Sequence, residues 1–239
     1  MNNKKNPLSY LSRAELVLWG VSVLIIALAF VLFDGENYLS MITSLIGVSS
    51  LIFLAKGHPV GQVLIIIFSI LYGIISFSFS YFGEMITYLG MTLPMAVLSL
   101  VSWLRHPYRE GSSEVAAREL RGRHFIAVSA LSAAVTVLFY FILGALDTAN
   151  LIPSTISVAT SFFAASLTYL RSPYYALGYA LNDVVLIVLW VMATLADPSY
   201  ISVTVCFIVF LVNDIYGFIS WRRMLARQKR ESSSETLGQ

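Results

Sequence analysis

The sequence predicts an all-α integral membrane protein with eight transmembrane helices. Of its 239 residues, 58% are hydrophobic and 12% charged, and the mean hydropathy is +0.79, whereas soluble proteins average about 25% charged residues. Apolar runs long enough to cross about 30 Å of hydrocarbon recur along the chain. The fifteen Lys and Arg residues are confined to the segments between and around those runs. So much apolar surface must face lipid, which excludes an ordinary soluble enzyme.

The apolar runs follow one another with short breaks. They are expected near residues 14–33, 38–55, 60–82, 85–104, 125–146, 151–170, 174–196 and 199–221. Lipid-facing strands alternate polar and apolar residues, whereas 63–70 and 184–191 are apolar at consecutive positions, which favours helices. Most breaks hold turn formers, as in 56–59 and 171–173. Segment 105–124 is the one long break, and we expect a solvated cytoplasmic connector there and a disordered tail after Arg230.

The basic residues indicate the orientation. Three precede the first run, one follows the second, five follow the fourth, one follows the sixth and five follow the eighth, so all fifteen lie on one side. Basic loops normally stay in the cytoplasm, which predicts that both termini are cytoplasmic. The alternative for the first run is a cleavable signal peptide that starts with Lys4 and Lys5 and ends at Ala27–Ala29. Cleavage would leave the other seven helices in the same orientation.

Metal, cofactor and nucleic-acid functions find no support in the sequence. Cys206 is the only cysteine, and His58, His106 and His124 are scattered, without metal-ligand spacing. No Gly-x-x-x-x-Gly-Lys run is present, which argues against ATP-driven transport by this chain. A net charge of +2 does not indicate nucleic-acid binding. The expected partners are therefore the lipid bilayer and a small-molecule substrate.

Two halves of the chain carry the same residue types at the starts and ends of corresponding runs. Asn37 and Asn150 precede corresponding runs, and Pro59 and Pro173 end corresponding basic turns. Ser102-Trp103 and Ser220-Trp221 each stand before arginine. We therefore expect an N-terminal helix (1–37), a first three-helix repeat (38–104), a connector with a linker helix (105–150), a second repeat (151–223) and a tail (224–239). Such a 3+1+3 plan of parallel repeats is known in transporters, although prolines and interfacial tryptophans recur in any polytopic protein.

Two Asn-Asp pairs lie inside predicted spans. Asn182-Asp183 and Asn213-Asp214 are about 12 and 8 residues from the flanking Arg171 and Arg222, or about 18 and 12 Å of helix. An ionisable group at this depth costs several kcal/mol and is a functional candidate. We expect the two aspartates on a ligand pathway. For Asn182 and Asn213 an interhelical hydrogen bond is an equal alternative.

Aromatic and polar residues extend these faces. Trp190 and Trp221 each follow an aspartate by seven residues, two helical turns, and Tyr179 shares the face of Asp183. Gln62 and Tyr72 fall within one polar stripe of the third span, which indicates a wetted wall.

Three residues have simpler interpretations. Trp103 and Trp221 stand before arginines, so anchoring at the membrane interface is expected for both. Glu84 is expected to end its helix at the outer surface.

Over residues 38–223 the chain resembles the nicotinamide riboside transporter (PnuC) family. The resemblance lies in six stretches: Tyr81-Phe82-Gly83-Glu84-Met85, Leu93-Pro94-Met95, Ser102-Trp103-Leu104-Arg105, Arg171-Ser172-Pro173-Tyr174-Tyr175, Asn182-Asp183 with Trp190, and Asn213-Asp214-Ile215-Tyr216-Gly217 with Trp221. It implies a fold like that of the SWEET sugar transporters with an extra first helix, and a homotrimer in the bacterial inner membrane. It also implies facilitated diffusion, with trapping of the riboside by a cytoplasmic kinase.

Nicotinamide riboside is a flat pyridinium cation on a ribose, and the residues above suit it. Trp190, Tyr179, Tyr72 and Tyr88 are candidates to sandwich the ring, at roughly 0.5–2 kcal/mol per cation–π contact. Asp183 or Asp214 would balance the charge or bind ribose hydroxyls, and Asn182, Asn213 and Gln62 would bind hydroxyl or carboxamide groups. Ala96 stands where many relatives carry glutamine, so thiamine and riboflavin, which related members handle, are alternative substrates.

Two other mechanisms compete with passive uptake. Asp183 or Asp214 binding a proton during transport would make the chain an ion-coupled carrier. An intramembrane aspartyl protease also places one aspartate on each of two helices. Asp214 follows Val212-Asn213 rather than the Gly-x-Gly of that protease signature, so the protease is the remote alternative.

Overall fold

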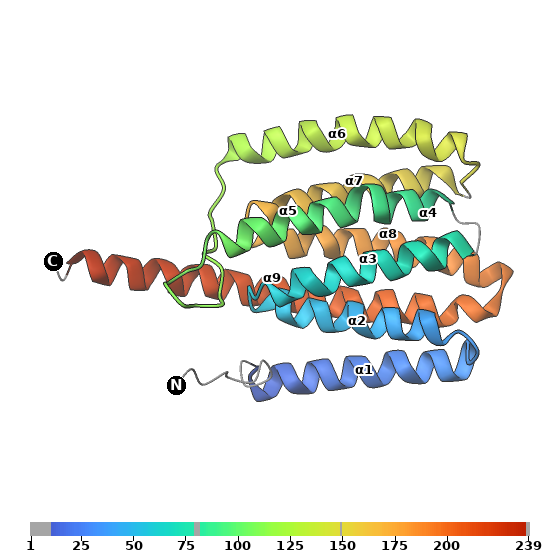
Figure 1. Ribbon diagram of the computed structural model, residues 1–239, viewed down its shortest axis with the longest axis horizontal. Coiled ribbons are helices and arrows are strands. Elements are labelled where there is room, and N and C mark those ends of the chain that lie inside the picture. The colour runs from blue at the N-terminus through green and yellow to red at the C-terminus, as the bar shows by residue number, and fades with distance from the viewer. Residues whose placement is uncertain (1–10, 79–81, 149, 238–239) are drawn as a thin grey trace.

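The computed structural model describes residues 11–78, 82–148 and 150–237 of the chain. Lys4, Lys5 and Tyr81 lie outside these ranges. The described elements are all helical (Figure 1): α1 (Arg13–Phe33), α2 (Tyr38–Ala55), α3 (Val60–Ser78), α4 (Phe82–Thr87), the π-helical turn η2 (Tyr88–Thr92), α5 (Leu93–Leu104), α6 (Gly122–Ala145), α7 (Leu151–Tyr169), α8 (Tyr174–Ala196), the 3₁₀ turn η3 (Pro198–Tyr200) and α9 (Ile201–Leu237).

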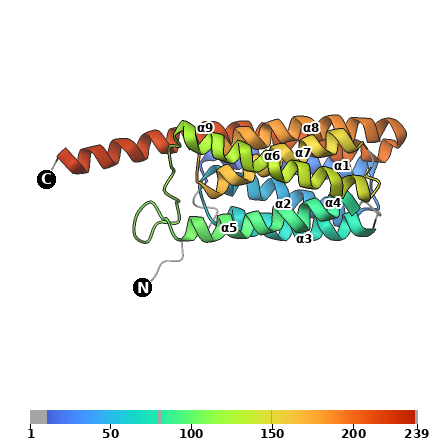
Figure 2. The ribbon, with the colours of Figure 1, turned by 90° about the horizontal axis from the view of Figure 1, so that it is seen from above.

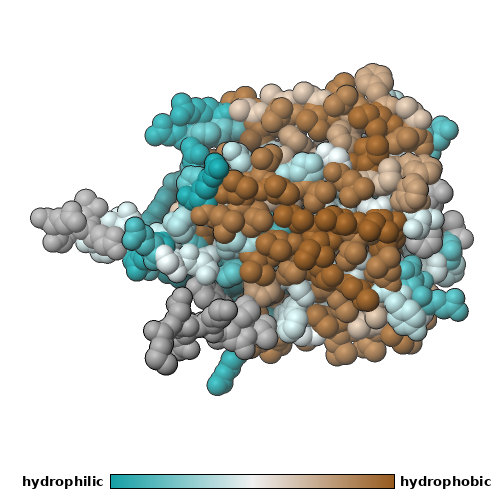
Figure 3. All heavy atoms as spheres, viewed as in Figure 1, coloured by the Kyte–Doolittle hydropathy of each residue, from teal (hydrophilic) through white to brown (hydrophobic). Residues whose placement is uncertain are grey.

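Eight of the described helical segments are long and apolar enough to cross a membrane, which confirms the predicted number of spans. They run side by side, and large apolar side chains cover the outside of the bundle (Figure 3). Several are strongly exposed, among them Leu195 at 85% and Ile126 at 73%. In water such a surface would be unstable, whereas in lipid it costs nothing to expose.

The fourth span is a single helix with a local irregularity. It runs from Phe82 to Leu104, and in η2 the Leu93 N–H bonds to the Tyr88 carbonyl, five residues back. Pro94 follows at once, and a proline has no N–H and crowds the carbonyl four residues before it. Widening the preceding turn relieves that clash. The sequence prediction of one span here is correct, but the π turn is not visible in the hydropathy pattern.

The helices form a layered bundle. In Figure 1, α1 and α6 lie along opposite edges, with the other spans between them. Helix α1 packs on α2 and α9, whereas α6 packs on α7. Helix α8 packs between α7 and α9, and α2 packs on both α3 and α9. The centre of the bundle is therefore enclosed by α2, α3, η2, α7, α8 and α9.

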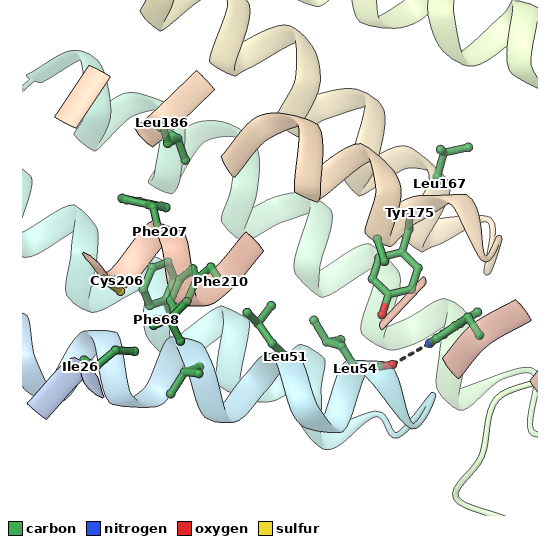
Figure 4. Packing of buried hydrophobic residues seen from close by; sticks show 14 of the residues in the cluster. Ile26, Leu51, Leu54, Phe68, Leu167, Tyr175, Leu186, Cys206, Phe207 and Phe210 are labelled. Atoms are coloured by element: carbon green, nitrogen blue, oxygen red, sulfur yellow. Dashed lines mark hydrogen bonds between the residues drawn. The ribbon is translucent and has the colours of Figure 1, made fainter. Parts of the chain in front are cut away.

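Two tryptophans close the end of the bundle that carries the basic loops. The indole N–H of Trp103 on α5 donates to the Thr168 carbonyl at the end of α7 (2.9 Å), and that of Trp221 on α9 donates to the Leu54 carbonyl at the end of α2 (2.7 Å; Figure 4). The rings are 1% and 0% exposed, with centroids 5.3 Å apart. The expectation that they anchor the protein at the membrane interface is therefore wrong. They satisfy helix-end carbonyls inside the bundle instead.

The serines before these tryptophans repeat the pattern. Ser102 Oγ donates to the Tyr169 carbonyl at 2.8 Å, and Ser220 Oγ donates to the Ala55 carbonyl at 2.7 Å. Each Ser-Trp pair thus satisfies two successive carbonyls at the end of a helix in the other half of the chain. We call these two sets of hydrogen bonds the Ser-Trp clasps.

The segment between α5 and α6 is docked, contrary to the expectation of a solvated connector. Val115 is 1% exposed, and its N–H bonds to the Gly57 carbonyl in the α2–α3 turn at 3.0 Å. The Arg118 N–H bonds to the Arg171 carbonyl in the α7–α8 turn at 2.9 Å. Gln228 on α9 holds the same segment through the Val115 carbonyl and the Ala117 N–H. The polar composition hides these backbone contacts.

The chain after Arg230 continues as helix to Leu237, so the expectation of a disordered tail is also wrong. Three ion pairs join the end of α9 to the connector: Glu231 with Arg109 at 2.9 Å, Arg227 with Glu114, and Lys229 with Glu119. The hydrogen bond and the charge of Lys229 lower the pKa of Glu119. In Figures 1 and 2 this part of α9 projects beyond the bundle next to the connector.

We predict that Gln228→Ala loosens the connector. The substitution removes its hydrogen bonds to the Val115 carbonyl and the Ala117 N–H, which stay buried. If the free energy that holds the connector in place falls by about 1.4 kcal/mol, the connector is detached from the bundle about tenfold more often. Trypsin should therefore cleave within residues 105–123 about tenfold faster. Ser233→Ala is the control, since this exposed serine bonds only within its own helix, and equal cleavage rates in the two variants would contradict the prediction.

Candidate binding cavity

A cavity lies in the middle of the bundle. Helix α2 contributes Gly47 and Ser50, α7 contributes serines, α4 contributes Glu84, and α8 and α9 contribute the two aspartates. The described lining residues are Gly47, Ser50, Leu51, Leu54, Ile65, Phe68, Gly83, Glu84, Thr87, Tyr88, Thr92, Leu143, Thr148, Ser154, Ser157, Ser161, Ala165, Tyr179, Asn182, Asp183, Leu186, Leu189, Phe207, Phe210 and Asp214. An apolar wall with a few converging polar groups is typical of a small-molecule site.

Asp183 and Asp214 face each other across the α8–α9 interface. They are 4% and 5% exposed, so both carboxyl groups are buried between neighbouring helices. Carboxyl groups buried close together repel one another when both are ionised. The sequence predicted both residues on the ligand pathway, and both line the cavity.

Asn182 is held from the neighbouring helix α7. Its Oδ1 accepts hydrogen bonds from Ser157 Oγ at 3.0 Å and from Thr160 Oγ1 at 2.8 Å. With its carbonyl oxygen occupied in this way, the amide group presents its N–H donors to the remaining space. Asn182 thus both links α7 to α8 and lines the cavity, so the two alternatives weighed for it are compatible.

Aromatic rings form part of the cavity wall. Phe68 on α3 lies 5.9 Å from Tyr88 on η2 and 6.3 Å from Phe210 on α9, centroid to centroid. Figure 4 shows Phe68, Phe207 and Phe210 gathered over α2. Gly47 makes this possible, because a Cβ at this position would lie 2.6 Å from Phe210 Cζ. Tyr179 of α8 completes the aromatic lining.

Glu84 is a cavity residue that the sequence interpretation missed. It belongs to the first turn of α4, and its Oε2 accepts a hydrogen bond from the Tyr72 hydroxyl at 2.9 Å. Tyr72 in turn packs on Tyr88, with centroids 4.3 Å apart. The expectation that Glu84 ends its helix at the outer surface is wrong, since the residue starts α4 and lines the cavity. The tyrosine on the polar stripe of α3 was the available signal for a buried partner.

Four of the nine predicted site residues are not among the described lining residues. Trp190 lies behind the wall and packs on Phe207 and Tyr200. Asn213 faces α1, where its Nδ2 donates to Ser22 Oγ at 2.9 Å. Gln62, in the first turn of α3, is 2% exposed but does not line the cavity. Tyr72 does not line the cavity either, but it contacts the lining residues Tyr88 and Glu84. The other five, Asn182, Asp183, Asp214, Tyr179 and Tyr88, line it.

The charge of the cavity has one sign. Its described lining includes three carboxyl groups, of Glu84, Asp183 and Asp214, and no Lys, Arg or His. In a medium of low dielectric constant, such a site attracts a cation and repels an anion. The described parts of the chain also hold no cluster of His, Cys, Asp and Glu with the arrangement of a metal site.

A bundle with eight described spans around a central cavity with a few polar groups is typical of a multi-pass membrane protein of the transporter class. Residues 37–223 match the family described as nicotinamide mononucleotide transporter, and the chain belongs to this family. The resemblance to PnuC proteins is thereby confirmed. Because the family consists of transporters, the prediction that the chain is not an enzyme is also confirmed, and the protease alternative is withdrawn.

Two known proteins are similar over most of their length. The nicotinamide riboside transporter PnuC of Neisseria mucosa is 25% identical over 215 residues, which are 88% of this chain and 81% of that protein. The crystal structure of the vitamin B3 transporter PnuC superimposes with a TM-score of 0.79 at 24% identity and covers 91% of this chain and 94% of that one. At that level of identity, the structural match establishes the fold.

We predict that Asp183→Asn is tolerated better than Asp183→Ala. The amide can donate a hydrogen bond to the carboxylate of Asp214, whereas alanine leaves that buried carboxylate without a partner, at a cost of about 1–3 kcal/mol. The thermal unfolding midpoint in detergent should therefore be lower for the alanine variant. Asp197→Ala, at an exposed position just after α8, controls for removal of a carboxylate. Equal midpoints for the asparagine and alanine variants would contradict the prediction that residue 183 contacts the carboxylate of Asp214.

Proposed function

We propose that this protein carries nicotinamide riboside into the cytoplasm by facilitated diffusion, and that a cytoplasmic kinase traps the riboside by phosphorylation. The observation that carries the proposal is the central cavity, in which Asp183, Asp214 and Asn182 line the same space as several aromatic rings, without a basic side chain in the described lining. A pyridinium ring is a flat cation, and such a ring gains from aromatic faces and carboxylates together. The name of the Neisseria relative supports the same substrate.

Within this proposal each lining group has a role. Tyr179, Tyr88 and the phenylalanines contact the ring, and Asp183 and Asp214 balance its charge. Asn182 binds the carboxamide or a ribose hydroxyl through its N–H donors. Trp190 supports the ring wall through Phe207, and Asn213 stabilises the packing of α9 against α1.

The charge of the cavity favours the riboside over its phosphorylated form. A phosphate group carries close to two negative charges at neutral pH and is normally bound by Arg, Lys or N–H groups at a helix start. The described lining offers three carboxyl groups and no basic side chain. Discrimination of this kind would also keep the phosphorylated product inside the cell, so trapping requires no further device.

We also propose the 3+1+3 arrangement with its SWEET-like fold, with boundaries at 38–104, 105–150 and 151–223. The Ser-Trp clasps support it, because the last helix of each proposed repeat satisfies the end of the first helix of the other. Arg13, Lys56, Arg171 and the connector arginines lie at the same end of the bundle, which supports cytoplasmic termini in a bacterial inner membrane. A homotrimer is part of the proposal on the family resemblance.

The second candidate is a proton- or ion-coupled carrier of nicotinamide riboside or of a related vitamin such as thiamine or riboflavin. The burial of two carboxyl groups, of Asp183 and Asp214, at the cavity is the observation that favours coupling. Thiamine is also a cation and fits the same charge argument, whereas riboflavin is uncharged and gains nothing from the carboxylates.

Titration of the purified protein with nicotinamide riboside tests the proposal. We predict that Asn182→Ala weakens binding about tenfold, because it removes one hydrogen bond worth about 1–1.5 kcal/mol. Asn213→Ala is the matched control and should keep its affinity, since its side chain bonds to Ser22 outside the cavity. If the folded wild-type protein gives no heat with the riboside but binds thiamine or riboflavin, the proposed substrate is wrong and that vitamin takes its place.

A competition experiment tests the charge argument separately. We predict that nicotinamide mononucleotide displaces bound riboside at least about a hundredfold less well than the riboside itself, because a buried phosphate without a cationic partner costs several kcal/mol. Equal potency of the two compounds would show that the phosphate lies outside the cavity or finds a basic partner.

A further inference from the structure

Glu84 is a carboxylate of the described cavity lining to which the proposed function assigns no contact with the ligand. It belongs to the first turn of α4, whereas the two aspartates lie on α8 and α9. Its Oε2 accepts a hydrogen bond from the Tyr72 hydroxyl at 2.9 Å. A carboxylate accepts up to about four hydrogen bonds, so this bond orients the group and leaves it able to contact a ligand.

Glu84 lies toward the end of the bundle opposite the basic loops. Helix α3 starts at the basic α2–α3 turn, and α4 starts at the other end of the bundle (Figure 1). Gly83, beside Glu84, packs so closely on Thr148 in the α6–α7 turn that a Cβ would have no room. Asp183, by contrast, stands about 13 residues before the end of α8 at Ala196, or about 20 Å of helix. A ligand that comes from this end therefore meets Glu84 before it reaches the aspartates.

The Ser-Trp clasps block access to the cavity from the end with the basic loops. Leu54 lines the cavity, and its carbonyl accepts the indole N–H of Trp221 at 2.7 Å. Trp103 packs on Trp221, and the two side chains are 1% and 0% exposed. With these rings in place, the entrance lies at the end that holds Glu84.

The ring of Tyr88 adjoins Glu84. The two residues are four apart, about one helical turn, and both line the cavity. Tyr72 packs on Tyr88 with centroids 4.3 Å apart and on Phe68 with centroids 5.6 Å apart, while its hydroxyl bonds to Glu84. One side chain thus positions both the carboxylate and the ring. A carboxylate next to an aromatic face suits a flat cation.

We propose that Glu84 and Tyr88, positioned by Tyr72, form an entry site that selects the positively charged ring of the ligand at the outer end of the cavity. This inference rests on the proposed function and names the residues that give it a preference for a cation. No proton or other ion moves with the ligand, as facilitated diffusion requires. A carboxylate at the entrance also raises the local concentration of cations and the rate at which they enter.

Nicotinamide riboside and its reduced form test the entry site, because the ring of the first is a cation and that of the second is uncharged. Both are titrated into the wild type and into Glu84→Gln, which keeps the size of the side chain and an oxygen that accepts from Tyr72. We expect Glu84→Gln to weaken binding of the riboside about tenfold and binding of the reduced riboside less than about twofold.

Two further variants control for the charge. Glu36→Gln removes the same charge from an exposed position in the α1–α2 turn, outside the described cavity lining, and should leave both affinities unchanged. Glu84→Asp keeps the charge and should keep a preference for the cationic riboside. If Glu36→Gln lowers the affinity for the riboside as much as Glu84→Gln does, the effect comes from the overall charge of this end and the entry site is wrong.

Tyr72→Phe tests the positioning role of Tyr72. The variant keeps the ring that packs on Tyr88 and removes the hydroxyl that bonds to Glu84. We expect it to weaken binding of the riboside about threefold in the wild type, and to have no further effect in the Glu84→Gln background, because the hydroxyl acts through the carboxylate. An equal loss in both backgrounds would contradict the positioning role.

The outcomes separate the entry site from the function on which it rests. If the wild type binds the riboside but Glu84→Gln changes the affinities for both ligands equally, the entry site is wrong and the proposed function stands. If the folded wild type binds neither ligand, the proposed function is wrong, and the entry site with it. If Glu84→Gln does not fold, Tyr72→Phe decides. A loss confined to the cationic riboside supports the entry site, and an equal loss for both ligands overturns it.

Discussion

Hydrocarbon supplies no hydrogen-bond partners, and this constraint accounts for much of the structure. Helices satisfy their own backbone, and many polar side chains within the spans bond back to a carbonyl one turn earlier, as Thr43, Ser69 and Thr155 do. Helix ends have no such internal solution. The Ser-Trp clasps provide one at the end with the basic loops, where they satisfy the last carbonyls of α2 and α7 with donors from α9 and α5.

The same lack of hydrogen-bond partners in the hydrocarbon explains where the polar side chains of the spans are found. Some polar groups that are not satisfied within their helix are paired across helices, and others line the cavity. Asn213 is paired with Ser22, and Asn182 is paired through its oxygen alone and keeps its donors available. Under the proposed repeat, the two halves contribute unequally. The second half supplies Asn182 and both aspartates, whereas the first supplies Glu84 and the aromatic residues Phe68 and Tyr88.

Hydropathy and charge were enough to predict the helices and the place of the two aspartates at the cavity, because an acidic residue within a long apolar run can be recognised from the sequence alone. They could not distinguish Asn182 from Asn213, since both stand in the same dipeptide at similar depths. That difference depends on the rotation of α9 against α1. Trp221 was misjudged for a related reason, because a tryptophan before arginine has the same sequence context at a lipid interface and inside a bundle. The docked connector depends on backbone bonds that its polar side chains do not reveal.

The docked connector also limits how the bundle can change shape. It bonds the α2–α3 turn at Gly57 and the α7–α8 turn at Arg171 through residues only three apart, and Gln228 ties it to α9. The two hairpin turns are therefore joined by a short strap of fixed length. Rocking of one half against the other would have to hinge close to this strap, with the larger displacement at the opposite end of the bundle.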